Sequence, residues 1–217
     1  GEQVEQIRGF SLVRAKSEPR GLEDVAVSSD QFYFVINRGD EELWCSDGTT
    51  EGTFSIGKYS EITDTEIVQD RFYYVGSNLS DGPGLWAIDS TASTRQIIKN
   101  FDAGIRNLLY LTEYKGKLVF SAYTREHGQE LWVSDGTAAG TNMVFDLFPG
   151  TNSGINDDYE VIETGLLSID EPPFRDYNYF VESGGWLYFQ ANNGAAGYEL
   201  YKTNLDTVML AADLAAG

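Results

Sequence analysis

The stretch that decides the fold is Glu130-Leu131-Trp132-Val133-Ser134-Asp135-Gly136-Thr137, and a second Gly-Thr pair follows it at Gly140-Thr141. An apolar run that ends in Asp-Gly-Thr is typical of a strand that enters a tight turn. Gly accepts a positive φ in such a turn, and the short Asp and Thr side chains bond nearby backbone groups. We therefore expect a strand through Trp132 and a turn at Asp135.

The same pattern returns in four places along the chain. Its apolar anchors are Glu42-Leu43-Trp44, Gly84-Leu85-Trp86, Glu130-Leu131-Trp132 and Glu199-Leu200-Tyr201. An aromatic-rich run such as Phe32-Tyr33-Phe34-Val35 lies ten to twelve residues before the aromatic residue of each anchor. Three residues after that aromatic residue comes Asp47, Asp89, Asp135 or Asn204. Spacing that recurs this regularly indicates an internal repeat.

Each repeat is interpreted as four short strands, A to D, joined by hairpin turns. Helical signals are nearly absent, because no long window keeps apolar residues at a spacing of ~3.6 between good caps. The predicted strands are apolar on both alternating positions, which indicates sheets covered on both faces. Repeated four-stranded sheets packed face to face are typical of a β-propeller. We predict an all-β fold, a propeller or propeller part of about four four-stranded blades; a sandwich or barrel of unrelated strands is the alternative.

The repeat also places the predicted blade boundaries. Residues 1–21 are expected to hold the outer strand of an incomplete or shared blade, since Phe10-Ser11-Leu12-Val13-Arg14-Ala15 stands where a final strand belongs. Blades are expected over residues 22–60, 61–104, 105–154 and 155–217. Four blades and an extra strand are an awkward number for the ring closure that protects a propeller's edges. The chain is therefore expected to be a fragment or a subunit of something larger.

Charge and composition argue against several classes of function. The 217 residues include 34 Asp and Glu against 15 Lys and Arg, which gives a formal net charge of −19. We therefore expect no nucleic acid and no membrane insertion, because both partners need features that an acidic chain without a long apolar run lacks. One His and one Cys exclude zinc sites built from several such ligands and an intrachain disulfide. No cofactor is expected, and Ca²⁺ held by oxygen ligands is the natural candidate for any metal.

The stretch around Trp132 resembles a known repeat. It is similar to the ELWxxDGT repeat of bacterial extracellular and cell-surface proteins, and residues 42–49 match it as well. The other two units are degenerate, with Ser90 where Gly is expected and with Tyr201 and Asn204 in place of Trp and Asp. The resemblance implies a propeller-like architecture and an extracellular or cell-surface location, but it implies no activity. The Asp-Gly-Thr turn is also similar in layout to the Asp-box of sialidases, which is a structural turn.

The fourth unit carries a long acidic insertion, expected at residues 155–178. Long loops on a rigid scaffold are where binding usually resides. In a propeller the D-to-A and B-to-C loops emerge on one face, so the insertion is expected beside the turns near Arg38 and Arg125. Carboxylates with tyrosines can bind Ca²⁺, a sugar or a basic partner, whereas the alternative is a solvated loop without a ligand. The candidate residues for ligand or partner binding are Asp157, Asp158, Tyr159, Asp170, Glu171, Arg175, Asp176 and Tyr177.

Other residues that resemble functional groups are expected to pack. The anchor tryptophans Trp44, Trp86 and Trp132 hold the same place in each repeat, which favours packing between blades over sugar stacking. Cys45 replaces the Val133 of the third unit and is expected to be a small buried residue. His127 lies in a turn without a nucleophile motif beside it and is expected to be a surface residue.

These observations favour a non-catalytic extracellular propeller module. It would serve as a structural or adhesive component of a cell-surface assembly, with protein subunits of that assembly or a glycan bound through its loop face. The alternative is a propeller enzyme, a polysaccharide hydrolase or lyase that uses carboxylates of the insertion such as Asp158 and Glu171. A glycosidase of the usual kind needs two carboxyl groups ~5 to 9 Å apart, so the distance between such a pair separates the two hypotheses.

Overall fold

The structure confirms the all-β fold. A computed structural model describes residues 23–37, 41–78, 82–89, 95–101, 108–155, 179–195 and 197–214. Within these ranges the regular elements are strands, and none is a helix that could cross a membrane. The outer strand predicted within residues 1–21 lies outside the described residues.

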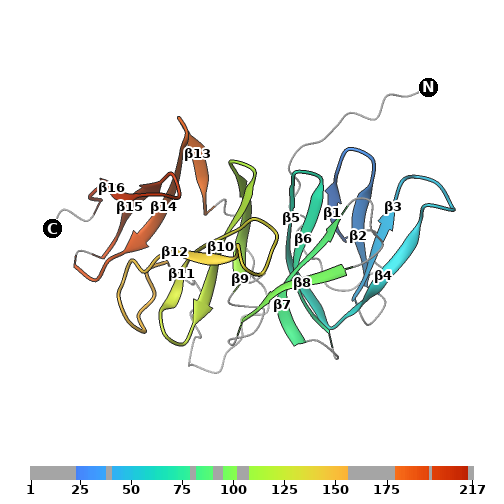
Figure 1. The fold of residues 1–217 in the computed structure, drawn as a ribbon, viewed down its shortest axis with the longest axis horizontal. Coiled ribbons are helices and arrows are strands. Elements are labelled where there is room, and N and C mark those ends of the chain that lie inside the picture. The colour runs from blue at the N-terminus through green and yellow to red at the C-terminus, as the bar shows by residue number, and fades with distance from the viewer. Residues whose placement is uncertain are drawn as a thin grey trace, which may run out of the picture.

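Four antiparallel sheets of four strands follow one another along the described chain (Figure 1). Blade 1 comprises β1 (Glu23–Val27), β2 (Phe32–Asn37), β3 (Glu41–Ser46) and β4 (Phe54–Tyr59). Blade 2 comprises β5 (Glu61–Val68), β6 (Arg71–Asn78), β7 (Gly82–Asp89) and β8 (Arg95–Asn100). Blade 3 comprises β9 (Leu108–Tyr114), β10 (Lys117–Thr124), β11 (Gly128–Ser134) and β12 (Asn142–Phe145). Blade 4 comprises β13 (Val181–Ser183), β14 (Trp186–Asn192), β15 (Tyr198–Thr203) and β16 (Val208–Ala212).

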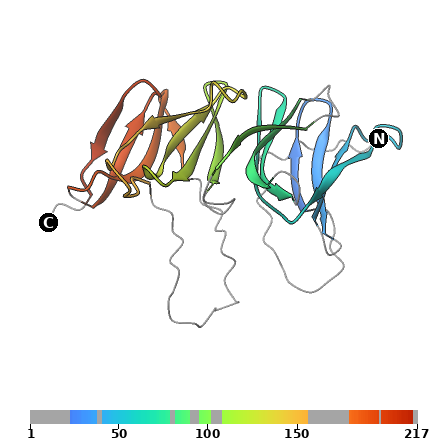
Figure 2. The ribbon, with the colours of Figure 1, turned by 60° about the horizontal axis from the view of Figure 1, so that its bottom comes forward.

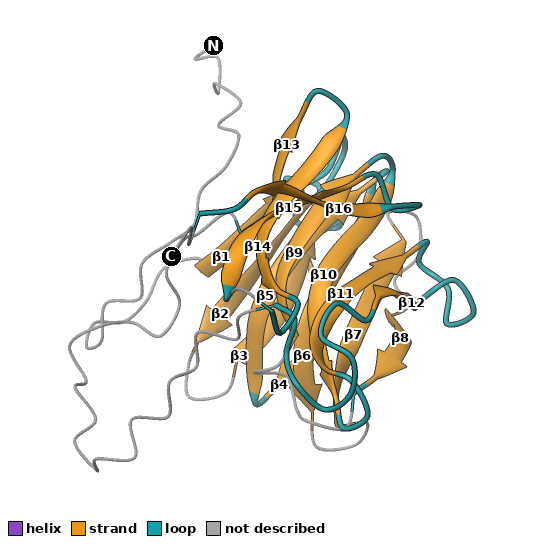
Figure 3. Cartoon of the chain, turned by 90° about the vertical axis from the view of Figure 1, so that its left-hand side faces the viewer, coloured by secondary structure: helices purple, strands orange, loops and turns teal. Residues whose placement is uncertain are grey.

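In each sheet the strands pair in chain order, and the sheets stack one behind another (Figure 3). This is the architecture of a β-propeller-like fold, with blade packed on blade. Strand D of blade 3 is shorter than the apolar run 143–148 suggested, because β12 ends at Phe145 and the backbone after it turns toward a buried carboxylate described below.

Each strand sends alternate side chains to the two faces of its sheet. We call the face toward the preceding blade the leading face; in blade 2 it carries Tyr74 and Trp86, which pack against blade 1. The face toward the following blade is the trailing face; in blade 2 it carries Val75 and Leu85, which pack against blade 3. Both faces of blade 2 are apolar because both are covered, as the sequence pattern predicts.

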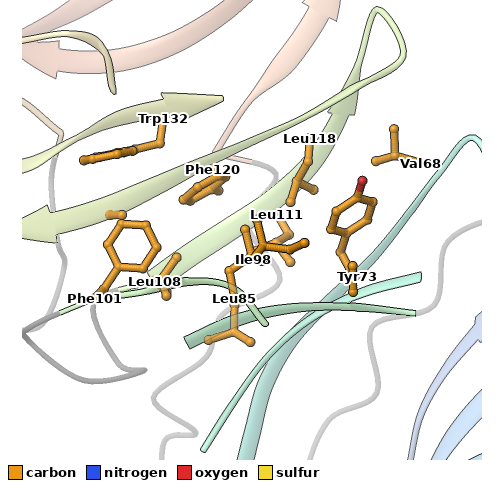
Figure 4. Packing of buried hydrophobic residues seen from close by; sticks show 13 residues of the cluster. Val68, Tyr73, Leu85, Ile98, Phe101, Leu108, Leu111, Leu118, Phe120 and Trp132 are labelled. Carbon is orange, nitrogen blue, oxygen red and sulfur yellow. The ribbon is translucent and has the colours of Figure 1, made fainter. Parts of the chain in front are cut away.

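The cores lie between the blades. Between blades 2 and 3, trailing-face residues meet leading-face residues (Figure 4): Tyr73, Leu85 and Ile98 on one side, Leu118, Phe120 and Trp132 on the other. Trp86 and Trp132 are buried in such clusters, so these two anchor tryptophans pack between blades as predicted. Cys45 is also buried, between blades 1 and 2, and burial raises the pKa of its thiol.

The Asp-Gly-Thr turns have the conformation that the sequence indicated. Gly48 and Gly136 have φ angles of +88° and +87°. Asp135 Oδ1 accepts hydrogen bonds from the backbone N and from Oγ1 of Thr137, at 2.9 and 2.7 Å. These bonds hold the pKa of the Asp135 carboxyl below its usual range. The same pair of bonds forms in the first repeat, so each turn is fixed by its own side chains.

A carboxylate joins blades 2 and 3 at their first strands, β5 and β9. Asp64 Oδ2 accepts a hydrogen bond from the backbone N of Leu111 at 2.9 Å, while Oδ1 accepts one from Thr65 N at 2.8 Å. Burial raises the pKa of Asp64 to about 7, against the lowering effect of these two N–H groups. Asp64 therefore fixes two strands that lie next to each other in space but 40 residues or more apart in the chain.

We expect Asp64→Ala to lower the free energy of unfolding by about 2 kcal/mol, because the Leu111 N–H loses its acceptor in a partly buried place. Denaturant unfolding checks this value. Asp30→Ala is the control, since Asp30 is exposed on blade 1. Equal losses in the two variants would show that packing alone holds β5 to β9.

Candidate binding surface

The candidate residues of the insertion, Asp157 to Tyr177, lie outside the described residues. What the structure describes is the segment that leads into them, residues 146–155, which follows β12. We call residues 146–155 the insertion base. Its contacts show which part of the molecule the insertion starts from.

The insertion base is hydrogen-bonded to both neighbouring blades. The backbone N atoms of Gly154 and Ile155 donate to Gln129 O in blade 3, at 3.1 and 3.0 Å. Gly154 O accepts from the backbone N of Asn192 in blade 4, at 2.8 Å. Gln129 and Asn192 adjoin the B-to-C turns of their blades, so the base lies beside those turns, as expected from propeller geometry.

A buried carboxylate lies beneath the insertion base. Glu130 is completely buried and accepts hydrogen bonds from the backbone N atoms of Leu147, Phe148 and Gly154, at 3.2, 3.4 and 2.9 Å. Burial raises the pKa of Glu130 to about 7; the three N–H groups lower it and the nearby Asp146 raises it further. One side chain thus fixes both ends of the base.

The outer surface of the insertion base carries a His–Asp pair. His127 Nδ1 lies 2.8 Å from Asp146 Oδ2, and the two side chains are 37% and 26% exposed. Glu126 Oε2 lies 3.9 Å from His127 Nε2 and is 89% exposed. The backbone N of His127 donates to Thr124 Oγ1 at 3.2 Å, which fixes the turn. We call Glu126, His127 and Asp146 the acidic rim.

The acidic rim presents carboxylates around an oriented imidazole at the edge of a rigid loop. Such an arrangement can receive a cationic group or hydrogen-bond donors of a ligand. In the insertion base, Ser153 Oγ accepts a hydrogen bond from Gln129 N at 3.1 Å, which gives this hydroxyl a structural role. The described part of the chain holds no group of three or more His, Cys, Asp or Glu side chains placed to bind a metal.

Sequence reasoning identified His127 as a surface residue but missed its partner. Asp146 lies 19 residues away and follows strand D, so no local motif joins the two. The D-to-A and B-to-C loops of a propeller lie close together, so Asp146 after strand D could have been predicted to lie near His127 in the B-to-C turn. Glu130 was assigned only to the repeat motif, and its buried position could not be inferred from Glu42, which occupies the same repeat position and is partly exposed.

The comparisons with known proteins bear on the fold alone. No family model matches the chain, and a search of curated proteins finds no match. Similar solved structures include a puromycin hydrolase mutant complexed with PGG, at 10% identity and a TM-score of 0.50, over 83% of this chain and 26% of that chain. Others are the computationally designed Ika8 protein (12%, TM-score 0.48, 91% and 50%) and the beta-propeller domain of the Trilobed protease from Pyrococcus furiosus (13%, TM-score 0.35, 88% and 71%). This chain thus spans about a quarter of the hydrolase and half of the designed protein.

Proposed function

We propose that the chain is a non-catalytic binding module of an extracellular or cell-surface assembly. It binds a protein partner or a glycan through the loop face of blades 3 and 4, where the acidic rim lies beside the insertion base. The observation that carries this proposal is the insertion base, which is held by Gln129, Glu130 and Asn192 on two blades at once.

A base fixed in this way supports recognition because it loses little conformational entropy when a partner binds. Binding surfaces that are organised before contact lose less conformational entropy than loops that must be ordered. The rim adds acidic groups at the edge of the base, and the chain as a whole has a net charge of −19. A partner with a basic surface is therefore the protein class that this face fits best.

The proposal predicts a charge-dependent loss of binding at the acidic rim. Lysozyme, a small basic protein, serves as a probe of cationic protein surfaces. Combining Glu126→Gln with Asp146→Asn is expected to weaken lysozyme binding about fivefold, since each charge at the rim contributes roughly 0.5 kcal/mol to the binding free energy. Biolayer interferometry at two salt concentrations measures the loss, and high salt should shrink it.

The matched control carries Asp30→Asn and Asp206→Asn, which remove the same charge from exposed positions away from the rim. If both double variants lose equal affinity, the attraction is a property of net charge and the rim is not the site. A glycan array read with and without Ca²⁺ tests the second ligand class. A glycan whose binding survives the loss of the rim charges would move the site elsewhere on the chain.

A further inference from the structure

The blades form an open row, with blade 1 and blade 4 at opposite ends (Figures 1 and 2). Within the described part of the chain, no other blade packs on the leading face of blade 1 or on the trailing face of blade 4. Every internal junction joins a trailing face to a leading face. The described part of the chain therefore carries one unmatched face of each kind.

The internal junctions show which contacts join a trailing face to a leading face. Between blades 1 and 2, the ring of Tyr33 stacks on that of Phe72, with centroids 4.2 Å apart and an interplanar angle of 4°. Between blades 2 and 3, the guanidinium of Arg71 donates from Nη1 to Gly136 O at 2.7 Å. The junction between blades 2 and 3 thus combines apolar side chains with a cation that meets the Asp-Gly-Thr turn of the following blade.

The unmatched leading face, that of blade 1, has the two features that a trailing face contacts: a row of aromatic rings and an Asp-Gly-Thr turn. Phe32, Phe34 and Trp44 form a stacked row, with ring centroids 5.5 and 6.4 Å apart. Beside the row lies the turn that begins at Asp47. Among the described residues other than its two chain neighbours, none has an atom within 4 Å of the point where a Cβ on Gly48 would stand, whereas the same point on Gly136 is 2.1 Å from Arg71 Nη1.

The unmatched trailing face, that of blade 4, has the features that a leading face contacts: aromatic side chains and a cation. Tyr188 occupies the repeat position of Tyr33, and Trp186 occupies that of Arg71. Lys202 Nζ lies 4.9 Å from the centre of the Trp186 ring, so a cation stands close to the place that Arg71 fills in blade 2. Val181 of the first strand is 53% exposed, which leaves apolar surface at the same end of the molecule.

We propose that a second copy of this chain covers both faces, with the trailing face of blade 4 in each copy packed on the leading face of blade 1 in the other. Both halves of the junction are present on one chain, and the positive Lys202 would meet the acidic turn at Asp47. Two such contacts related by a two-fold axis close a ring of eight blades, within the range of ~4–8 blades that propellers use. Closure leaves no blade face uncovered, whereas a single junction would leave one at each end.

The mass of the native particle tests this closure directly. Light scattering during size exclusion is expected to give twice the chain mass of 24.1 kDa. Lys202→Glu is expected to weaken association at least tenfold, because a carboxylate would then face Asp47. Lys115→Glu, an equal charge reversal at the exposed turn between β9 and β10, should leave association unchanged. A particle of 24.1 kDa at high protein concentration would overturn the proposal.

Cross-linking tests which faces meet. In a Cys45→Ala background, one variant carries Tyr188→Cys and another carries Phe32→Cys, the positions that correspond to the stacked Tyr33–Phe72 pair. A short bis-maleimide is expected to link a mixture of the two variants and to leave each variant alone unlinked. Linkage of either single variant with itself would mean that like faces meet, and no linkage in a mixture of dimers would mean that other surfaces associate; both results contradict the proposal.

Discussion

Gly136→Ala is expected to lower the free energy of unfolding by about 3 to 4 kcal/mol. The φ of Gly136 is +87°, where a Cβ costs about 1 to 2 kcal/mol. That Cβ would stand 2.1 Å from Arg71 Nη1 and 2.4 Å from Tyr73 Oη, so the Arg71 side chain must withdraw. Withdrawal breaks its hydrogen bond to Gly136 O, and a bond from a charged donor contributes about 2 kcal/mol.

Gly48→Ala is the matched control, because Gly48 has the same turn and a φ of +88° but open space around its Cβ position. It should lose only the backbone term of about 1 to 2 kcal/mol. Denaturant unfolding at a dilution that keeps the chain as one copy measures both variants. In an Arg71→Ala background, the cost of Gly136→Ala should fall to that of Gly48→Ala. An unchanged cost in that background would show that the junction between blades 2 and 3 does not depend on Arg71.

The fold could be predicted from the sequence because the same structural repeat occurs four times along the chain. Leu85-Trp86 and Leu131-Trp132 each mark the third strand of their blades, and an Asp or Asn follows the anchor aromatic residue at the same distance even where Tyr201 replaces Trp. The strand and turn patterns of one repeat are weak evidence for a fold. Four repeats together are strong evidence, because one architecture must accommodate all of them. The pairing of each anchor with the aromatic run upstream follows directly, as in Phe120 opposite Trp132.

The candidate surface could be predicted only in outline. The closeness of D-to-A and B-to-C loops is a property of the architecture, so the placement of residues 146–155 beside Gln129 and Asn192 followed from the fold. The pairing of His127 with Asp146 depends on the path of individual residues after β12, and no repeat fixes that path. Burial of Glu130 likewise depends on the three N–H groups of the insertion base that reach it. Glu199 holds the same repeat position in blade 4 and is also buried, with the backbone N of Leu214 as its donor.

Glu130→Ala is expected to lower the free energy of unfolding by about 3 to 5 kcal/mol. The backbone N–H groups of Leu147, Phe148 and Gly154 all lose their acceptor, and a completely buried cavity is left in place of the carboxylate. Glu42→Ala is the matched control, since Glu42 holds the same repeat position but is partly exposed and accepts from Ser55 Oγ at the surface. Its loss should stay below about 1 kcal/mol. Hydrogen exchange should also speed up at the three N–H groups in Glu130→Ala alone.

The titration of Glu130 makes a second, independent consequence measurable. Its pKa is raised to about 7 in the folded chain from the ordinary value of 4.5, so the folded state binds the proton more tightly than the unfolded state does. The stabilising contribution of this group is therefore fully present below pH 4.5 and is lost as the pH rises through about 7, with a span of roughly 3 kcal/mol. The Gln side chain of Glu130→Gln cannot titrate, so the free energy of unfolding of this variant should fall less steeply than that of the natural chain across this window. Its NH₂ group opposes one N–H donor and lowers stability at every pH.

The carboxyl of Asp64 has its pKa raised to about 7 as well, and Asp64→Asn should remove a separate part of the same slope of stability against pH. Unfolding curves collected at a series of pH values check both contributions, and parallel curves for Glu130→Gln and the natural chain would show that Glu130 is ionised throughout the window in the folded state.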